Sequence, residues 1–145
     1  MNIFELQRNI HLIDLKDIGK DVLLGNESRA LIVELQKKQL LQGKDSDGED
    51  IKPLYRSGSY SAVKQRMNSL PSYGTPDLKL TGSFHRSIYF DANTISLKSS
   101  DAKTPSLMEK YGEQTLGLNE DSIEEYRPYF DYRLTEEFIM RLEGR

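Results

Sequence analysis

The sequence predicts an α+β fold with N-terminal helices, a small antiparallel sheet containing a β-hairpin, and a C-terminal helix. Apolar residues recur at helical spacing through the first 42 residues and again at the C-terminal end. Between them, two runs rich in β-branched and aromatic residues flank a short polar connection. No repeat, linker or low-complexity tract divides the 145 residues, so we expect a single domain over residues 1–145.

The N-terminal region predicts a first helix over roughly residues 4–23, with a break near Gly19. The apolar positions recur at steps of three to five, with polar residues between them. Gly25 is the expected stop. Residues 1–25 are therefore a candidate helical arm, which we expect to become ordered on assembly.

A second helix is predicted over residues 27–41. Asn26 is the expected N-cap, because its side chain can accept a hydrogen bond from an unpaired amide of the first turn. Gly43 is the expected stop at the other end, because glycine readily adopts the left-handed conformation that ends helices.

The acidic stretch LQGKDSDGEDIKPL, residues 41–54, predicts a turn. An EF-hand loop needs a carboxylate at its twelfth position, but counting from Asp45 that position is Arg56, a cation. Aspartate and glycine also favour turns, because aspartate bonds nearby amides and glycine tolerates positive φ. We expect this corner to hold Ile51 and Leu54 against the core.

The centre of the chain predicts a helix over residues 59–69 and an irregular loop over residues 70–76. Leu78 and Leu80 then alternate with polar neighbours, which is typical of a strand with one face on the core. A short turn starting at Gly82 follows.

A hairpin is predicted next. Residues 87–90 and 94–97 have strand composition, and residues 91–93 form a connection of suitable length. A short helix over residues 105–111, closed by Gly112, should follow.

The C-terminal region predicts an extended segment and then a helix. Residues 126–130 should be extended, because Pro128 disfavours a helical conformation at Arg127. A terminal helix should begin at Thr135, where apolar residues again recur at helical spacing.

Composition excludes several classes of function. The chain has no cysteine, which rules out disulfides, zinc-thiolate sites and cysteine nucleophiles. A net charge of −3 gives no chain-wide basic field for DNA. Because we find no leader pattern and no long apolar run, we expect a soluble protein that is neither exported nor membrane-bound.

No catalytic constellation is evident. Pro76-Asp77 resembles half of a metal-dependent nuclease motif, but Asp50-Ile51-Lys52 lies upstream of it, in the wrong order. His85 has serines and Asp91 nearby, yet a hydrolytic triad also needs a nucleophile elbow, and the chain has no Gly-x-Ser-x-Gly. His11 fits a helix surface. Phosphate-binding glycine loops are also absent. We expect no catalytic residue, metal or cofactor, and no enzyme activity.

The segment YRPYFDY is the best candidate interface. Tyrosine and arginine are enriched at protein interfaces, because each combines a large contact area with a polar end. The segment could equally pack against the domain's own core. The candidate interface residues are Tyr126, Arg127, Tyr129, Phe130, Tyr132 and Arg133.

The order of these elements resembles a known family. The pieces that carry the resemblance are the Gly43 to Gly48 turn, the stretch LKLTGSFHRSI over residues 78–88, the sequence MEKYG over residues 108–112, and RPYF before the last helix. Together they resemble the tailed-bacteriophage virion morphogenesis family, whose members act in tail completion or head-tail joining. The sequence departs from the family's pattern at Ile51, where an aromatic residue is common, and at Glu109, where the usual residue is histidine.

The resemblance covers about residues 35–142 and implies a structural virion protein at the head-tail junction, the neck or the tail end. It implies a homo-oligomeric ring, a hexamer or a dodecamer, docked on connector, neck or tail-tube proteins and assembled in the host cytoplasm. DNA passing through the ring would make only passive contact. The alternatives from other classes are an intracellular regulatory or toxin-associated binding module and a metal-dependent nuclease.

Overall fold

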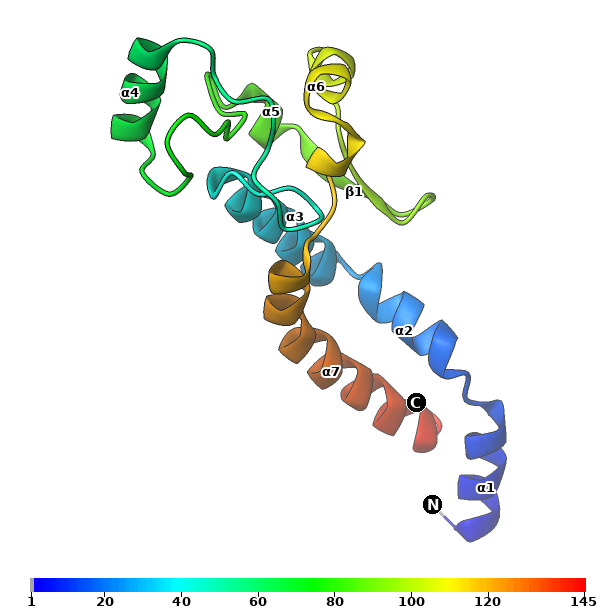
Figure 1. Cartoon of the computed structure of the whole chain (residues 1–145). Coiled ribbons are helices and arrows are strands. Elements are labelled where there is room, and N and C mark those ends of the chain that lie inside the picture. The colour runs from blue at the N-terminus through cyan, green and yellow to red at the C-terminus, as the bar shows by residue number, and fades with distance from the viewer. Residues whose placement is uncertain (1) are drawn as a thin grey trace.

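The computed structural model describes residues 2–145 and has the α+β architecture that the sequence predicts (Figure 1). The elements in chain order are α1 (Ile3–Leu12), α2 (Leu15–Leu23), α3 (Asn26–Leu41), α4 (Gly58–Met67), α5 (Ser83–Arg86), β1 (Ile88–Asp91), β2 (Ser96–Ser99), α6 (Thr104–Tyr111), a 3₁₀ turn η1 (Glu113–Thr115) and α7 (Glu120–Leu142).

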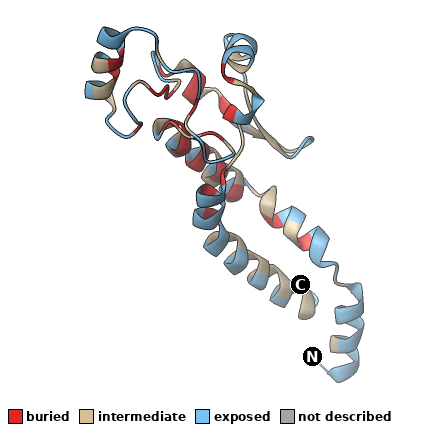
Figure 2. Cartoon of the chain, in the orientation of Figure 1, coloured by how far each residue is buried: buried red, intermediate tan, exposed pale blue. Residues whose placement is uncertain are grey.

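The molecule consists of a head and a stalk. The head, residues 26–119, contains α3 to α6 and the hairpin. The stalk, residues 2–25 and 120–145, pairs α1 and α2 with α7, and both chain termini lie at its far end (Figure 1). Figure 2 shows that most buried residues gather in the head and at its junction with the stalk, that α2 also carries buried residues, and that α1 carries none.

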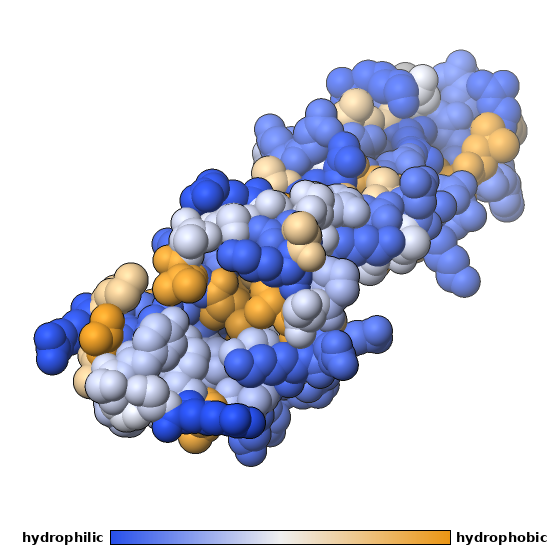
Figure 3. Space-filling model, turned by 90° about the horizontal axis from the view of Figure 1, so that it is seen from above, coloured by the Kyte–Doolittle hydropathy of each residue, from blue (hydrophilic) through white to orange (hydrophobic). Residues whose placement is uncertain are grey.

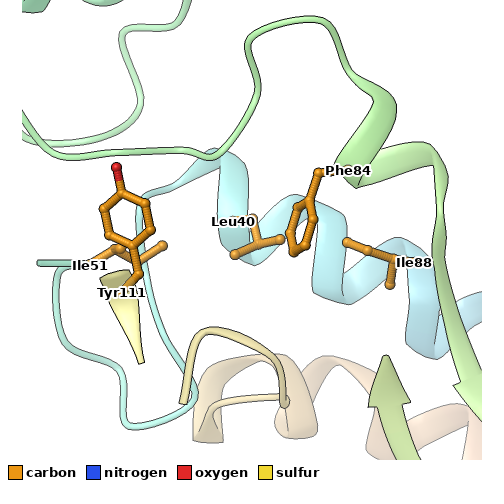
Figure 4. Packing of buried hydrophobic residues seen from close by; sticks show 5 residues of the cluster. All are labelled: Leu40, Ile51, Phe84, Ile88 and Tyr111. Atoms are coloured by element: carbon orange, nitrogen blue, oxygen red, sulfur yellow. The ribbon is translucent and has the colours of Figure 1, made fainter. Parts of the chain in front are cut away.

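The core of the head joins elements that are distant in sequence. Leu40 of α3 and Ile51 of the acidic turn pack with Phe84, Ile88 and Tyr111, from α5, β1 and α6 (Figure 4). Leu40 and Ile51 are almost completely buried. Burying a side chain of this size contributes roughly 1.5–3 kcal/mol, so this cluster fixes the turn, the hairpin and α6 on α3.

A second cluster joins the head to the stalk. Ile32 and Leu35 of α3 pack with Tyr126 of α7, and Tyr129 and Phe130 lie against the same cluster. The Tyr126 ring centroid is 5.9 Å from that of Tyr129 and 6.0 Å from that of Phe130. The stalk is thus anchored through the first half of α7.

Several predicted elements are confirmed. The helix predicted over residues 27–41 is α3, and Gly43 follows it with φ 72°. Helices α4 and α6 match the predictions within a residue or two. The hairpin pairs Ile88 with Ser99 and Asp91 with Ser96. Its second strand begins later than predicted, because Thr94 and Ile95 lie in the turn and Ile95 has φ 51°.

The N-terminal break is not at Gly19. Helix α1 ends before Ile13, and Asp14 caps α2 by accepting the Lys16 amide at 2.9 Å. An aspartate N-cap strongly favours the start of a helix at the next residue, whereas a single glycine inside a helix does not have to end it. Gly19 lies inside α2, and a Cβ there would be 3.5 Å from Phe130 of α7.

The cap predicted at Asn26 is also wrong. Gly25 occupies the N-cap of α3, with extended backbone and no side-chain hydrogen bond. The Asn26 side chain instead accepts a hydrogen bond from Arg29 at 2.6 Å. Glycine is acceptable at an N-cap, so the helix begins one residue earlier than expected.

No strand forms at Leu78 and Leu80. Leu78 has φ 57°, and Leu80 is 69% exposed. The carboxylate of Asp77 accepts the Lys79 amide at 3.0 Å and bends the chain into a turn there. Leu54 also differs from expectation: it is 51% exposed, and only Ile51 of the pair packs into the core.

The extended segment predicted around Pro128 is helical. Pro128 lies inside α7, which runs unbroken from Glu120 to Leu142. A proline inside a helix costs about 3 kcal/mol. Burying Tyr126, with Tyr129 and Phe130 partly buried beside it, offsets that cost, because each fully buried large side chain contributes roughly 1.5–3 kcal/mol.

Candidate interaction surfaces

The predicted interface residues divide between the interior and the surface. Tyr126 is buried, and its hydroxyl lies 2.6 Å from Ser28 Oγ on α3. Tyr129 and Phe130 pack beside it. For these three residues the structure supports the core interpretation.

Of the other three predicted residues, Arg127 and Tyr132 are exposed on α7, whereas Arg133 is half-buried beside the end of α2. Arg127 binds Glu124 at 3.0 Å, and Arg133 binds Glu136 at 2.6 Å, both on α7 itself. Tyr132 is 64% exposed. This half of the predicted set remains a candidate interface.

The stalk exposes many large apolar side chains. Helix α1 has no buried residue, although Asn9 donates a hydrogen bond to the Leu142 carbonyl of α7 at 2.8 Å. The exposed large apolar residues of the stalk are Ile3, Phe4, Ile10, Leu12, Leu15, Ile123, Tyr132, Ile139 and Met140. The N-terminal arm therefore has much apolar surface that its own chain leaves uncovered.

A second surface is the lobe formed by residues 52–86, which includes α4. It exposes Leu54, Tyr60, Val63, Met67, Leu70, Tyr73 and Leu80. A pocket of about 180 Å³ opens between α4, the segment around Leu78 to Phe84, and α6. Seen from above the head, apolar residues line a hollow surrounded by polar residues, with the stalk behind it (Figure 3).

The lobe is strongly basic. It contains six basic residues and one acidic residue, Asp77, for a net formal charge of +5. Lys64 is buried against Asp77, whereas Lys52, Arg56, Arg66, Lys79 and Arg86 are exposed. Within residues 2–145 none of these five forms an ion pair with a carboxylate.

A buried polar cluster holds the lobe in place. Lys64 Nζ is 2.8 Å from an Asp77 carboxylate oxygen and donates to the Lys79 carbonyl at 2.6 Å. Asn68 donates to Asp77 at 3.0 Å and to the Leu41 carbonyl of α3 at 2.7 Å. His85 Nε2 lies 2.8 Å from the Asp77 carbonyl and carries the proton, because a carbonyl only accepts.

The electrostatics of this cluster are those of a structural site. Burial alone would raise the pKa of Asp77, but hydrogen bonds from Lys64, Asn68 and the Lys79 amide outweigh it and lower that pKa. Burial is also the main influence on His85, whose pKa it lowers. The pair is therefore an ionised Asp77 and a neutral His85 near pH 7.

The acidic segment 41–54 forms a turn, as predicted. One Asp45 carboxylate oxygen accepts the amides of Asp47 and Glu49, at 2.9 Å and 3.0 Å. Lys44 binds Asp50 at 2.7 Å. Across the part of the chain that the structure describes, no group of three or more histidine, aspartate or glutamate side chains is arranged to hold a metal ion.

Sequence reasoning missed the lobe as an interaction surface. The net charge of the whole chain is −3, and this total conceals the net charge of +5 on residues 52–86. A count of charges by segment finds the lobe directly.

Comparison with known protein families, with curated proteins and with solved structures finds no match for this chain. Among the helices of residues 2–145, none combines the length and the apolar character needed to span a membrane.

Proposed function

We propose that this chain is a structural virion protein of a tailed phage or prophage. It acts in assembly at the head-tail junction, the neck or the tail end. The stretch LKLTGSFHRSI and the RPYF sequence support the proposal through their resemblance to the virion morphogenesis family.

One structural observation supports an assembly role in particular. Among residues 2–145, ten hydrophobic side chains are buried, whereas eighteen large ones are exposed. Sixteen of those eighteen lie on the stalk and the lobe. Apolar patches concentrated in this way are typical of protein-protein contact sites.

The mechanism we propose is association of copies into a closed ring, a hexamer or a dodecamer, docked on connector, neck or tail-tube proteins. Burial of the exposed apolar and aromatic residues would supply affinity, and complementary charge would supply orientation.

The location can be tested by antibody labelling of particles purified from the phage that encodes the chain. We expect label at the neck or the tail end, and particles lacking the protein should accumulate as unjoined heads and tails. Absence of the protein from purified particles, together with a cytosolic partner, would contradict the proposal and favour the regulatory binding module.

A further inference from the structure

The two exposed surfaces carry opposite charge. The stalk contains twelve acidic and seven basic residues, a net formal charge of −5, against +5 on the lobe. All four arginines of residues 120–145 already bind carboxylates within the stalk. Twelve carboxylates against seven cations leave an acidic excess that the cations of the stalk cannot balance.

A mixed apolar and acidic stripe follows the outer face of α7. Asp121, Glu125, Tyr132, Ile139 and Glu143 are all exposed and recur at spacings that place them on one side of a helix. The Glu125 and Glu143 side chains are 51% and 45% exposed, although each already binds a cation, Lys38 and Arg145 respectively. The stripe extends over roughly 33 Å at 1.5 Å per residue.

The lobe presents a matching stripe. Tyr60, Val63 and Met67 lie three and four residues apart on one face of α4 and are 37%, 48% and 63% exposed. Arg56 and Arg66 are exposed close by in sequence. The α4 stripe, apolar with basic neighbours, thus complements the α7 stripe, which is apolar with acidic neighbours.

We propose that the α4 stripe of one copy packs against the α7 stripe of a second copy, head to tail. This inference rests on the proposed assembly function and names the surfaces that would perform it. Contact between two lobes, or between two stalks, would instead place like charges together, which destabilises an interface.

The geometry excludes the same contact within one copy. Helix α4 and the far end of α7 lie at opposite ends of the molecule (Figure 1). A contact between two different surfaces is heterologous, and it closes into a ring when the rotation between successive copies allows. The charge separation between lobe and stalk therefore favours a heterologous contact, which is the kind of contact that a ring requires.

Exposed aliphatic residues distinguish a protein partner from DNA. A phosphate backbone is bound by cations and polar groups, whereas Val63, Met67 and Leu70 offer apolar area that a phosphate backbone does not bury. DNA binding by the lobe is the competing outcome of the test.

The test uses the full chain and a pair of surface variants, measured by size-exclusion chromatography with light scattering. Arg56→Glu with Arg66→Glu alters the lobe, and Tyr132→Ala with Ile139→Ser alters the stalk. Each variant alone should associate at least roughly tenfold more weakly than the wild type. Because one variant keeps an intact lobe and the other an intact stalk, an equimolar mixture should form a one-to-one dimer and nothing larger.

The matched control is Lys16→Glu with Lys20→Glu on α2, which changes net charge as much as the lobe variant does. Both lysines are exposed on the stalk, so the control should assemble at least as well as the wild type. Circular dichroism should show the same fold for all variants, since every altered side chain has solvent access. Wild-type assembly should weaken as salt rises, because exposed charges are screened within about 3 Å at 1 M salt.

Three outcomes would overturn the inference. If only the stalk variant dissociates, or if the mixture gives no dimer, the contact is not head to tail, although the proposed assembly function survives. A wild type that stays monomeric at millimolar concentration overturns the self-contact outright. If the wild type is a monomer that binds short duplex DNA, and the lobe variant does not bind it, the lobe is a nucleic-acid-binding surface.

Discussion

Lys64→Met should destabilise the protein strongly, because it leaves the buried carboxylate of Asp77 without its counter-ion. The side chains of Lys64 and Asp77 are 7% and 3% exposed, and 2.8 Å separates their charged atoms. Removing one partner of a buried pair costs about 3–5 kcal/mol. The variant keeps two hydrogen bonds to Asp77, from Asn68 and the Lys79 amide, so we expect the lower half of that range.

Urea unfolding followed by circular dichroism measures this loss. For a protein of this size, each kcal/mol shifts the melting temperature by roughly 2–4 °C, so thermal melts should agree. Adding Asp77→Asn to Lys64→Met removes the unpaired charge and should recover part of the loss. A double variant as unstable as the single one would show that the charge is not the cause.

The control is Lys38→Met. Lys38 binds Glu125 at 2.9 Å, but both side chains are more than half exposed, so the cost should not exceed about 1 kcal/mol. The reasoning is refuted if Lys64→Met costs no more than Lys38→Met in the same assay.

Three further predictions concern stability. Tyr126→Phe removes the 2.6 Å hydrogen bond to Ser28 and leaves the buried Ser28 hydroxyl unpaired, so the free energy of unfolding measured in urea should fall by about 1–3 kcal/mol. An unchanged urea midpoint would contradict this contribution of the hydrogen bond. Pro128→Ala should stabilise α7 by up to about 3 kcal/mol, and a loss of stability would show that the helix depends on the proline. Because burial lowers the pKa of His85 in the folded state, the unfolded chain binds the extra proton first, and stability should fall as pH decreases below about 6.5. His85→Gln should flatten that dependence between pH 7 and pH 5, and a dependence equal to that of the wild type would assign it to other groups.

Local signals in the sequence were sufficient for α3, α4, α6 and the hairpin. Each has a clear periodicity and a glycine or polar residue at its end, so local preference and tertiary packing agree. Hairpin residues such as Ile95 differ from expectation only in the turn, where the sequence offered no asparagine-glycine pair to fix the register.

The errors have tertiary causes. Pro128 is a helix breaker by local preference, yet Tyr126 packs on α3 and keeps α7 continuous. Leu78 and Leu80 have a strand pattern, but the buried Asp77 captures the Lys79 amide and turns the chain. No local pattern specifies that a carboxylate will be buried, because its partner Lys64 lies thirteen residues upstream on another element.

Only part of the candidate interface could be predicted from the sequence, because tertiary packing decides which of its residues are exposed. Residue type alone selected the YRPYFDY segment, but the position of each side chain on α7 decides whether it contacts α3 or solvent. Positions 126, 129 and 130 face the head, whereas Tyr132 faces outward. The helical phase of α7 separates them, but Pro128 makes the local sequence favour an extended conformation in which that phase does not apply.

Helix α4 of the lobe is held mainly by polar contacts, and this links stability to assembly. Helix α4 buries only Ser61 and Lys64. Its residues Val63 and Met67 face solvent, and Tyr60 is 37% exposed with its ring edge-on to that of Tyr55. The Lys64 ion pair is therefore what fixes the orientation of the exposed stripe. If the stripe is the contact surface, Lys64→Met should weaken self-association under conditions where the stalk and the core of the head stay folded. Lys38→Met releases the Glu125 carboxylate of the α7 stripe, so association should be at least as strong as in the wild type. Measuring association and unfolding on the same two variants separates a lobe that is structurally important from one that also binds a second copy.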